Sequence, residues 1–116
     1  MTTVRPFSHQ GEFWETNFEP TMGHEQSGAH PALILSVDGL NAARWVSVVL
    51  PTSSQFKDIP TRIHVGASKT GLEADFDVLW DQIRSVDHGR VLYRRSTVSR
   101  TTLQRYAALV ERMIKV

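Results

Sequence analysis

The 116-residue sequence contains no cysteine. Disulfide bonds and cysteine-based zinc or redox chemistry are therefore excluded. It also lacks any apolar run that approaches the ~20 residues of a membrane-spanning helix, and its first residues contain no apolar signal core. Five histidines are present, but none of them has the H-x-x-x-H spacing of a helical metal site. From these absences we expect a cytoplasmic protein that neither spans nor binds a membrane.

The length and composition are typical of one folded domain. Hydrophobic residues make up 41% of the chain and charged residues 22%, which is ordinary for a globular protein. We therefore expect a single domain over residues 1–116. The first ten residues show no hydrophobic periodicity and include Pro6, so residues 1–10 are expected to form a loose N-terminal arm.

The net charge of +1 hides an uneven distribution of charge. Residues 1–56 carry two basic and five acidic residues, whereas residues 88–116 carry seven basic residues and one acidic residue. Arginine pairs bidentately with phosphate oxygens, so the basic C-terminal third favours a surface that faces nucleic acid. The alternative is a solvated strand and helix face that balances acidic groups elsewhere.

Short strand-like segments separated by polar turns predict a mainly β fold. Strands are expected over residues 12–18, 32–37, 45–50, 61–65, 76–80 and 91–98. Pro51 is expected to end the third strand. A capping box formed by Thr101 and Gln104 predicts the start of a C-terminal amphipathic helix. A small antiparallel barrel and an α+β sheet with a covering helix both fit this order.

Three polar segments interrupt the strands, and they contain the side chains most suited to chemistry. They are residues 24–30, 52–55 and 81–87, and we expect the fold to bring them together on one face. RNA cleavage without a metal needs a base for the 2′-hydroxyl, an acid for the leaving 5′-oxygen and a donor for the phosphate. Histidine, aspartate, arginine and hydroxyl groups in these segments could fill those roles.

Ordinary structural roles are the alternative for the same side chains. His30 could be a plain loop residue, His24 a hydrogen-bonding brace and Asp81 the cap of a turn. We favour the interpretation that Glu25 braces its own loop through backbone N–H groups. No motif surrounds the three remaining histidines, which we treat as incidental: His9, His64 and His88.

Several blocks of this sequence resemble the MazF/PemK/Kid toxins of bacterial toxin–antitoxin pairs. GHEQSG at residues 23–28 is similar to the family's G-[HS]-E-Q-x-G loop, and PALILS at 31–36 to the strand that follows it. DQIRSVD at 81–87 matches the family's D-Q-I-R-T-[IV]-D almost letter for letter. Further similar blocks are EFW at 12–14, FEP at 18–20, Asn41 and PTSSQ at 51–55. Together they span roughly residues 11–115.

The resemblance implies a fold and an activity. The fold would be a mainly β structure, an SH3-like β-barrel of the CcdB/MazF type with a C-terminal α-helix. The protein would be a homodimer and a sequence-specific endoribonuclease. It would cleave single-stranded RNA to a 2′,3′-cyclic phosphate and a 5′-hydroxyl without a metal or cofactor. Its partner would be a cognate antitoxin with an acidic disordered segment.

The resemblance also implies the site residues. The catalytic residues would be His30, Ser53, His24 and Asp81. The RNA-binding residues would be Thr52, Ser54, Gln55, Glu25, Gln26 and Arg84. In this chain His30 and Leu79 stand where the family has arginines, and Ser53 stands where it has threonine.

These departures change the expected mechanism. Histidine ordinarily titrates near pH ~6.5, so we expect His30 to act as acid, base or protonated phosphate ligand and activity to vary with pH near neutrality. Arg84 could supply the cation missing at Leu79, or it could be a structural partner of Asp81 or Asp87. The alternative function is a catalytically weakened homologue that binds antitoxin or RNA, or a CcdB-like topoisomerase poison.

Overall fold

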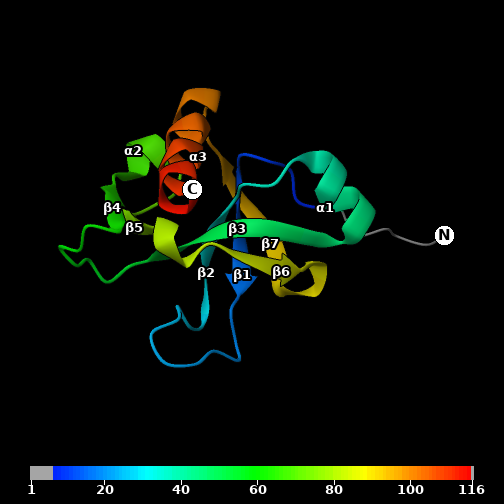
Figure 1. Ribbon diagram of the computed structural model, residues 1–116, viewed down its shortest axis with the longest axis horizontal. Coiled ribbons are helices and arrows are strands. Elements are labelled where there is room, and N and C mark those ends of the chain that lie inside the picture. Colours follow the sequence, from blue (N-terminus) through cyan, green and yellow to red (C-terminus); the bar gives the residue numbers. More distant parts are fainter. Residues whose placement is uncertain (1–6, 116) are drawn as a thin grey trace.

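The computed structural model describes residues 7–115, so most of the arm predicted over residues 1–10 lies outside the described residues. Seven antiparallel strands form one bent sheet in the order β4-β5-β3-β2-β1-β7, and β6 also pairs with β3 (Figure 1). The strands are β1 (Glu12–Asn17), β2 (Ala29–Ile34), β3 (Val46–Ser53), β4 (Arg62–Val65), β5 (Phe76–Leu79), β6 (Arg84–Asp87) and β7 (Val91–Thr97). The helices are α1 (Asp38–Arg44), α2 (Ala67–Thr70) and α3 (Arg100–Ile114), with 3-10 turns η1 (Trp80–Gln82) and η2 (His88–Arg90). The prediction of a mainly β fold with a C-terminal helix is confirmed.

The sheet buries side chains on both of its faces, which explains the continuous apolar runs in β2 and β3. One buried cluster lies under α3, where Phe13, Leu33 and Leu50 pack with Tyr106 and other residues of the helix. Their chain neighbours point the opposite way, because successive strand residues alternate between faces. Of these neighbours, Trp14, Ala32, Ile34 and Val49 belong to a second cluster, which also contains Phe18, Val86 and Val91.

Strand β3 changes partners along one of its edges. Residues 46–49 pair with β6 and residues 52–53 pair with β5, while residues 49–51 pair with β2 on the other edge. Pro51 therefore lies at the gap between β6 and β5. Proline has no N–H to donate, so it suits a position where one edge of the strand is unpaired. The prediction that Pro51 ends the strand is wrong, and Thr52 and Ser53 belong to β3.

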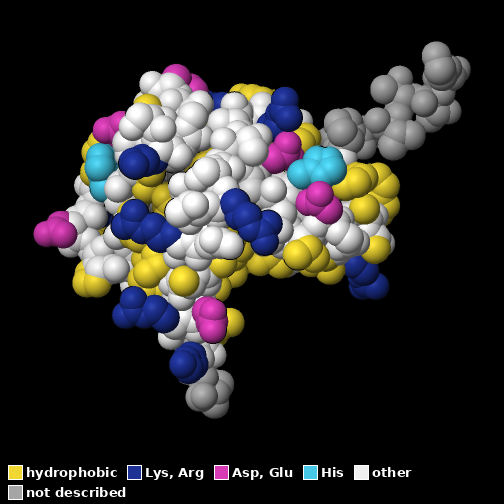
Figure 2. Space-filling model, turned by 90° about the horizontal axis from the view of Figure 1, so that it is seen from above, with side chains coloured by type: hydrophobic (Ala, Val, Ile, Leu, Met, Phe, Trp, Pro, Cys, Tyr) yellow, Lys and Arg dark blue, Asp and Glu magenta, His cyan; other side chains and the backbone are white. Residues whose placement is uncertain are grey.

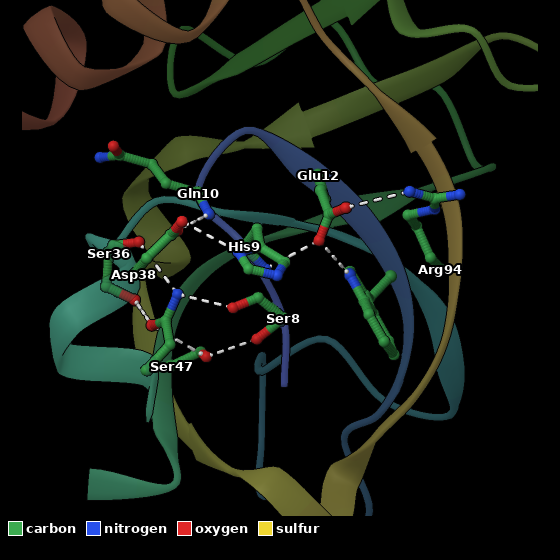
Figure 3. A network of polar contacts seen from close by, with 10 residues as sticks. Ser8, His9, Gln10, Glu12, Ser36, Asp38, Ser47 and Arg94 are labelled. Atoms are coloured by element: carbon green, nitrogen blue, oxygen red, sulfur yellow. Dashed lines mark hydrogen bonds and ion pairs between the residues drawn. The ribbon is translucent and has the colours of Figure 1, made fainter. Parts of the chain in front are cut away.

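The segment before β1 is held against the body of the protein by a polar network (Figure 3). The hydroxyls of Ser8 and Ser47 lie 2.7 Å apart. The N–H of Gln10 donates to Asp38 Oδ1 at 2.7 Å. The loose arm predicted over residues 1–10 therefore does not extend to these described residues.

The N-cap of helix α3 lies two residues before the predicted cap, Thr101. Ser99 is the N-cap, and its Oγ accepts the N–H of Thr102 at 3.2 Å. The helix buries Tyr106 and Val110, and burial raises the pKa of the Tyr106 hydroxyl. No helix among residues 7–115 combines the length and apolar content that a membrane span requires.

Other boundaries also differ from the predictions. β2 begins at Ala29 rather than Ala32, so His30 lies in a strand. The short helix α2 lies between two predicted strands, where no helix was predicted. β6 occupies the polar segment that follows η1, where no strand was predicted.

Candidate functional site

The loop between β1 and β2 carries the first polar segment, and its own contacts brace it. The N–H of Phe18 donates to the carbonyl of Gly28 at 2.9 Å, and the N–H of Gly28 donates to Glu19 Oε1 at 2.8 Å. Further out, Glu25 Oε1 accepts the N–H of Met22 at 2.8 Å. The interpretation that Glu25 braces its own loop is therefore confirmed, while its contact with RNA stays a prediction.

Gln26 joins all three polar segments. Its backbone N–H donates to Gln82 Oε1 at 2.7 Å, and its side-chain amide donates to the carbonyl of Thr52 at 2.6 Å. The side-chain amide of Gln82 donates in turn to the carbonyl of His24 at 3.2 Å. The expectation that the three segments converge is confirmed.

The first cleft lies where η1 crosses the gap in front of Pro51. Its volume is about 420 Å³, and its lining comprises His24, Glu25, Gln26, Pro51, Asp81, Gln82, Ile83 and Arg84. His24 and Asp81 are exposed. The guanidinium of Arg84 lies over the ring of Phe18, 5.6 Å from its centroid. The cleft therefore presents an imidazole, a carboxylate and a guanidinium to solvent.

Within residues 7–115 the side chains of these three groups form no hydrogen bond or salt bridge, and the Arg84 guanidinium contacts the Phe18 ring. No salt bridge joins Arg84 to Asp81 or Asp87, so the alternative of a structural ion pair is wrong for the described contacts. Asp81 lies in the first turn of η1, whose N-cap is Leu79 rather than an acidic side chain. The hydrogen-bonding groups of these three side chains are thus open to a ligand, whereas Glu25, Gln26 and Gln82 hold the cleft together.

The second cleft lies on the other side of Gln26. It has a volume of about 160 Å³ and is lined by Gln26, Ser27, His30, Ser53, Ser54 and Gln55. His30 is partly exposed and lies opposite Thr16 across β1 and β2. The Oγ of Ser53 accepts the N–H of Gln55 at 3.1 Å. The serine hydroxyl therefore shapes the loop that follows it.

The two clefts divide the residues expected for catalysis. His24 and Asp81 line the first cleft, while His30 and Ser53 line the second, and Gln26 belongs to both. A polymer that bridges both clefts would contact all four residues. A small ligand in one cleft would contact only half of them.

Two predicted site residues are buried: Ser53, which is 6% exposed and lines the second cleft, and Thr52, which lies deeper. The exposed fraction of Thr52 is 0%, and its hydroxyl donates to the carbonyl of Pro31 at 2.5 Å. Direct contact between this hydroxyl and RNA is therefore not available in the structure. Thr52 instead fixes β3 against β2 and presents its carbonyl to Gln26.

Two arginines of the basic C-terminal third, Arg94 and Arg95, form ion pairs within the protein. Arg95 Nη1 lies 2.6 Å from Glu15 and its Nη2 contacts Glu73, while Arg94 lies 3.4 Å from Glu12. In Figure 2 the Lys and Arg side chains of the face shown lie as separate groups rather than one patch. The alternative in which these arginines balance acidic groups elsewhere is confirmed for Arg94 and Arg95.

Sequence reasoning missed Gln82 as a site residue. Gln82 lines the first cleft and contacts two residues of the β1–β2 loop. The available signal was its position between Asp81 and Arg84, two residues that were selected. Chemistry alone did not select it, because a glutamine side chain does not titrate.

Comparisons with known proteins agree with this geometry. Residues 9–114 match the family model described as a PemK-like, MazF-like toxin of a type II toxin–antitoxin system. The endoribonuclease MazF9 of Mycobacterium tuberculosis is 32% identical over 100 residues, which cover 81% of this chain and 85% of the relative. The endoribonuclease toxin MazF of Escherichia coli K12 is 30% identical over 105 residues, 90% of this chain and 91% of the relative.

Solved structures show the same fold. A crystal structure of MazF from Deinococcus radiodurans superimposes with a TM-score of 0.85 and 26% identity, covering 97% of this chain and 100% of that one. A MazE–MazF structure from the same organism matches with a TM-score of 0.75 and 27% identity, covering 92% and 95%. This chain therefore belongs to the family of PemK-like, MazF-like toxins of type II toxin–antitoxin systems.

Proposed function

We propose that this protein is a sequence-specific endoribonuclease that cleaves single-stranded RNA and acts as the toxin of a toxin–antitoxin pair. The observation that carries the proposal is the convergence of His24, Asp81 and Arg84 on one open cleft. These three groups supply proton transfer and a cation at one place. Two similar proteins, MazF9 of Mycobacterium tuberculosis and MazF of Escherichia coli K12, are named endoribonucleases, which supports the same activity.

The proposed reaction is an internal transfer at phosphorus. A base removes the proton of a ribose 2′-hydroxyl, and the 2′-oxygen attacks the adjacent phosphorus. The bond from phosphorus to the 5′-oxygen breaks, and an acid returns a proton to that oxygen. The products are a 2′,3′-cyclic phosphate and a 5′-hydroxyl. His24, Asp81 and His30 are the candidates for the two proton transfers.

Arg84 is the proposed phosphate ligand. Oriented positive charge stabilises the charge that develops on the phosphate oxygens, and Arg84 lines the cleft without a carboxylate partner among the described residues. With this assignment, Arg84 supplies the positive charge that family members would have from an arginine at the position of Leu79. Ser54 and Gln55 border the second cleft, where we propose that they contact neighbouring nucleotides.

We further propose a homodimer that binds a cognate antitoxin through an acidic disordered segment. The MazE–MazF structure from Deinococcus radiodurans provides the precedent for such a pair. An acidic segment resembles an RNA backbone in charge, so it would compete for the same cationic groups. We place the protein in the cytoplasm, where its RNA substrate would be found.

The test is cleavage of a long mixed-sequence RNA by the purified protein at pH 6 to 8, with EDTA present. Primer extension should show breaks at a short recurring sequence, and the products should carry a cyclic phosphate. Intact RNA across this range, together with unchanged translation in a cell-free extract, would overturn the proposal. That result would favour a homologue that binds without cleaving.

The same assay tests His30. His30→Ala should lower cleavage and flatten its dependence on pH near neutrality, because a histidine that transfers a proton titrates in this range. His9→Ala is the matched control, since His9 pairs with Asp38 away from both clefts. Equal activity of His30→Ala and the wild type would remove His30 from the mechanism.

A further inference from the structure

The loop that joins β3 to β4 runs outward from the end of β3 (Figure 1), and a buried carboxylate contacts it. Asp77 of β5 has an exposed fraction of only 2%. It is the cross-strand partner of Ser53 on β3 and of His64 on β4. Directly opposite residues in antiparallel strands point to the same face, so the three side chains form one row under the loop.

Asp77 holds the loop at two places. Its Oδ2 accepts the N–H of Lys57 at 3.0 Å. The same oxygen lies 3.6 Å from Arg62 Nη1, which also donates to the carbonyl of Gln55 at 2.9 Å. The Arg62 side chain is only 13% exposed. A buried charge of this kind requires a partner, so Asp77 keeps Arg62, and with it Gln55, in place.

His64 adds a third tie to the same loop. Its Nδ1 lies 3.3 Å from Asp77 Oδ1, and its ring meets Phe56 edge-on with centroids 4.5 Å apart. The interpretation of His64 as an incidental residue is therefore wrong. Neither Asp77 nor His64 lines the first or second cleft, so any effect on a ligand there is indirect.

We infer that Asp77 is a positioning residue that determines RNA sequence preference. Through Arg62 and the Lys57 N–H, it fixes the Ser54 and Gln55 side of the second cleft. That side meets the bases next to the scissile bond. The inference rests on the proposed ribonuclease activity and names a residue that shapes its specificity.

The test compares two variants with the same change of charge. Asp77→Asn keeps the side chain's size and one acceptor oxygen but removes the charge that holds Arg62. Asp58→Asn is the control, because Asp58 is an exposed carboxylate of the same loop that forms no salt bridge among residues 7–115. Cleavage kinetics, primer-extension maps and amide exchange of Lys57 are measured for both variants.

For Asp77→Asn we expect the KM for RNA to rise about tenfold with kcat within about threefold of wild type. The set of cleaved sequences should broaden, and the Lys57 N–H should exchange with solvent roughly ten times faster. Asp58→Asn should match the wild type in all three measurements. A wild-type KM and a wild-type cleavage map for Asp77→Asn would overturn the inference.

Arg62→Gln keeps the test decisive if Asp77→Asn does not fold. It should broaden the cleavage map while leaving the salt dependence of KM unchanged. If Arg62 contacts a phosphate directly, its loss would instead lower the slope of log KM against log salt concentration by about one. This result would make Arg62 an RNA ligand and overturn the positioning role. A wild-type protein that cleaves no RNA overturns the proposed function. Exchange of the Lys57 N–H then decides by itself whether Asp77 holds the loop.

Discussion

The network around Asn41 and the clefts around Gln26 are both polar, but their hydrogen-bonding groups have different partners. Asn41 has an exposed fraction of 1%, and its side-chain amide contacts Ser8, Ser36 and Ser47. In the first cleft, by contrast, His24, Asp81 and Arg84 form no side-chain hydrogen bond or salt bridge within the described part of the chain.

The difference separates the groups around Asn41, which stabilise the fold, from the groups of the first cleft, which are free to bind a ligand. A buried amide must be satisfied within the protein, because leaving it unpaired costs about 1–3 kcal/mol. An exposed imidazole or carboxylate is satisfied by water and can exchange that water for substrate. Substitutions in the Asn41 network should therefore change stability, and those in the first cleft should change activity. The four predictions below follow from this division.

The largest expected effect is on activity in the first cleft. His24→Ala and Asp81→Asn should each lower kcat by about 10²–10⁴-fold, because each removes a candidate for proton transfer. Their free energies of unfolding should stay within about 0.5 kcal/mol of wild type. Single-turnover RNA cleavage and urea unfolding measure the two quantities. Ser85→Ala, an exposed site on β6, is the control.

The next largest effect is on stability. Asn41→Ala should lower the free energy of unfolding by roughly 2–4 kcal/mol, because it leaves several buried partners unsatisfied. Urea unfolding at a fixed temperature measures this loss. RNA cleavage per folded molecule should stay at the wild-type level. A large loss of kcat in this variant would show that the two polar regions are not independent.

Gln82 belongs to both kinds of group, because it lines the first cleft and also forms hydrogen bonds within the protein. Gln82→Ala removes the contacts to the Gln26 N–H and the His24 carbonyl, so kcat should fall about tenfold while stability falls by about 1 kcal/mol. Gln82→Glu keeps the acceptor for Gln26 but loses the donor to His24. Its activity should be intermediate, and equal loss in both variants would mean that the contact to His24 is the decisive one.

The smallest effect concerns Asp38, which lies at the rim of the Asn41 network. The N–H of Gln10 and then the ring of His9 lower the pKa of Asp38 below its usual 3.8. A lowered folded-state pKa stabilises the protein above the unfolded pKa, and the effect disappears as pH falls through the folded value. Asp38→Asn should therefore be less stable than wild type at pH 6, and the gap should close below about pH 3.8. Urea midpoints across pH 3 to 6 test this, and a constant gap would contradict it.

Much of the fold could be predicted from local pattern. The apolar runs in β2 and β3 indicated buried strands, and the capping box of Thr101 and Gln104 indicated a C-terminal amphipathic helix. The polar segments ended up together because each of them adjoins a strand of the same sheet. These features depend on neighbours in the chain, which a sequence displays directly.

The features that were missed depend on neighbours in space. Pro51 looked like the end of a strand because the gap between β5 and β6 is visible only once the sheet is assembled. Asp77 looked like an ordinary strand residue, since its partners Arg62 and Lys57 come from another strand and a loop. Thr52 was expected to bind RNA because of the family resemblance, and only packing shows that its hydroxyl is buried.

The gap at Pro51 has a consequence for how this fold can diversify. The crossing from Leu79 to Arg84 joins two strands that each keep their own register with β3. Residues could be inserted into or removed from the crossing without shifting either register. The depth and chemistry of the first cleft can therefore evolve, or be engineered, as a separable module on an unchanged sheet.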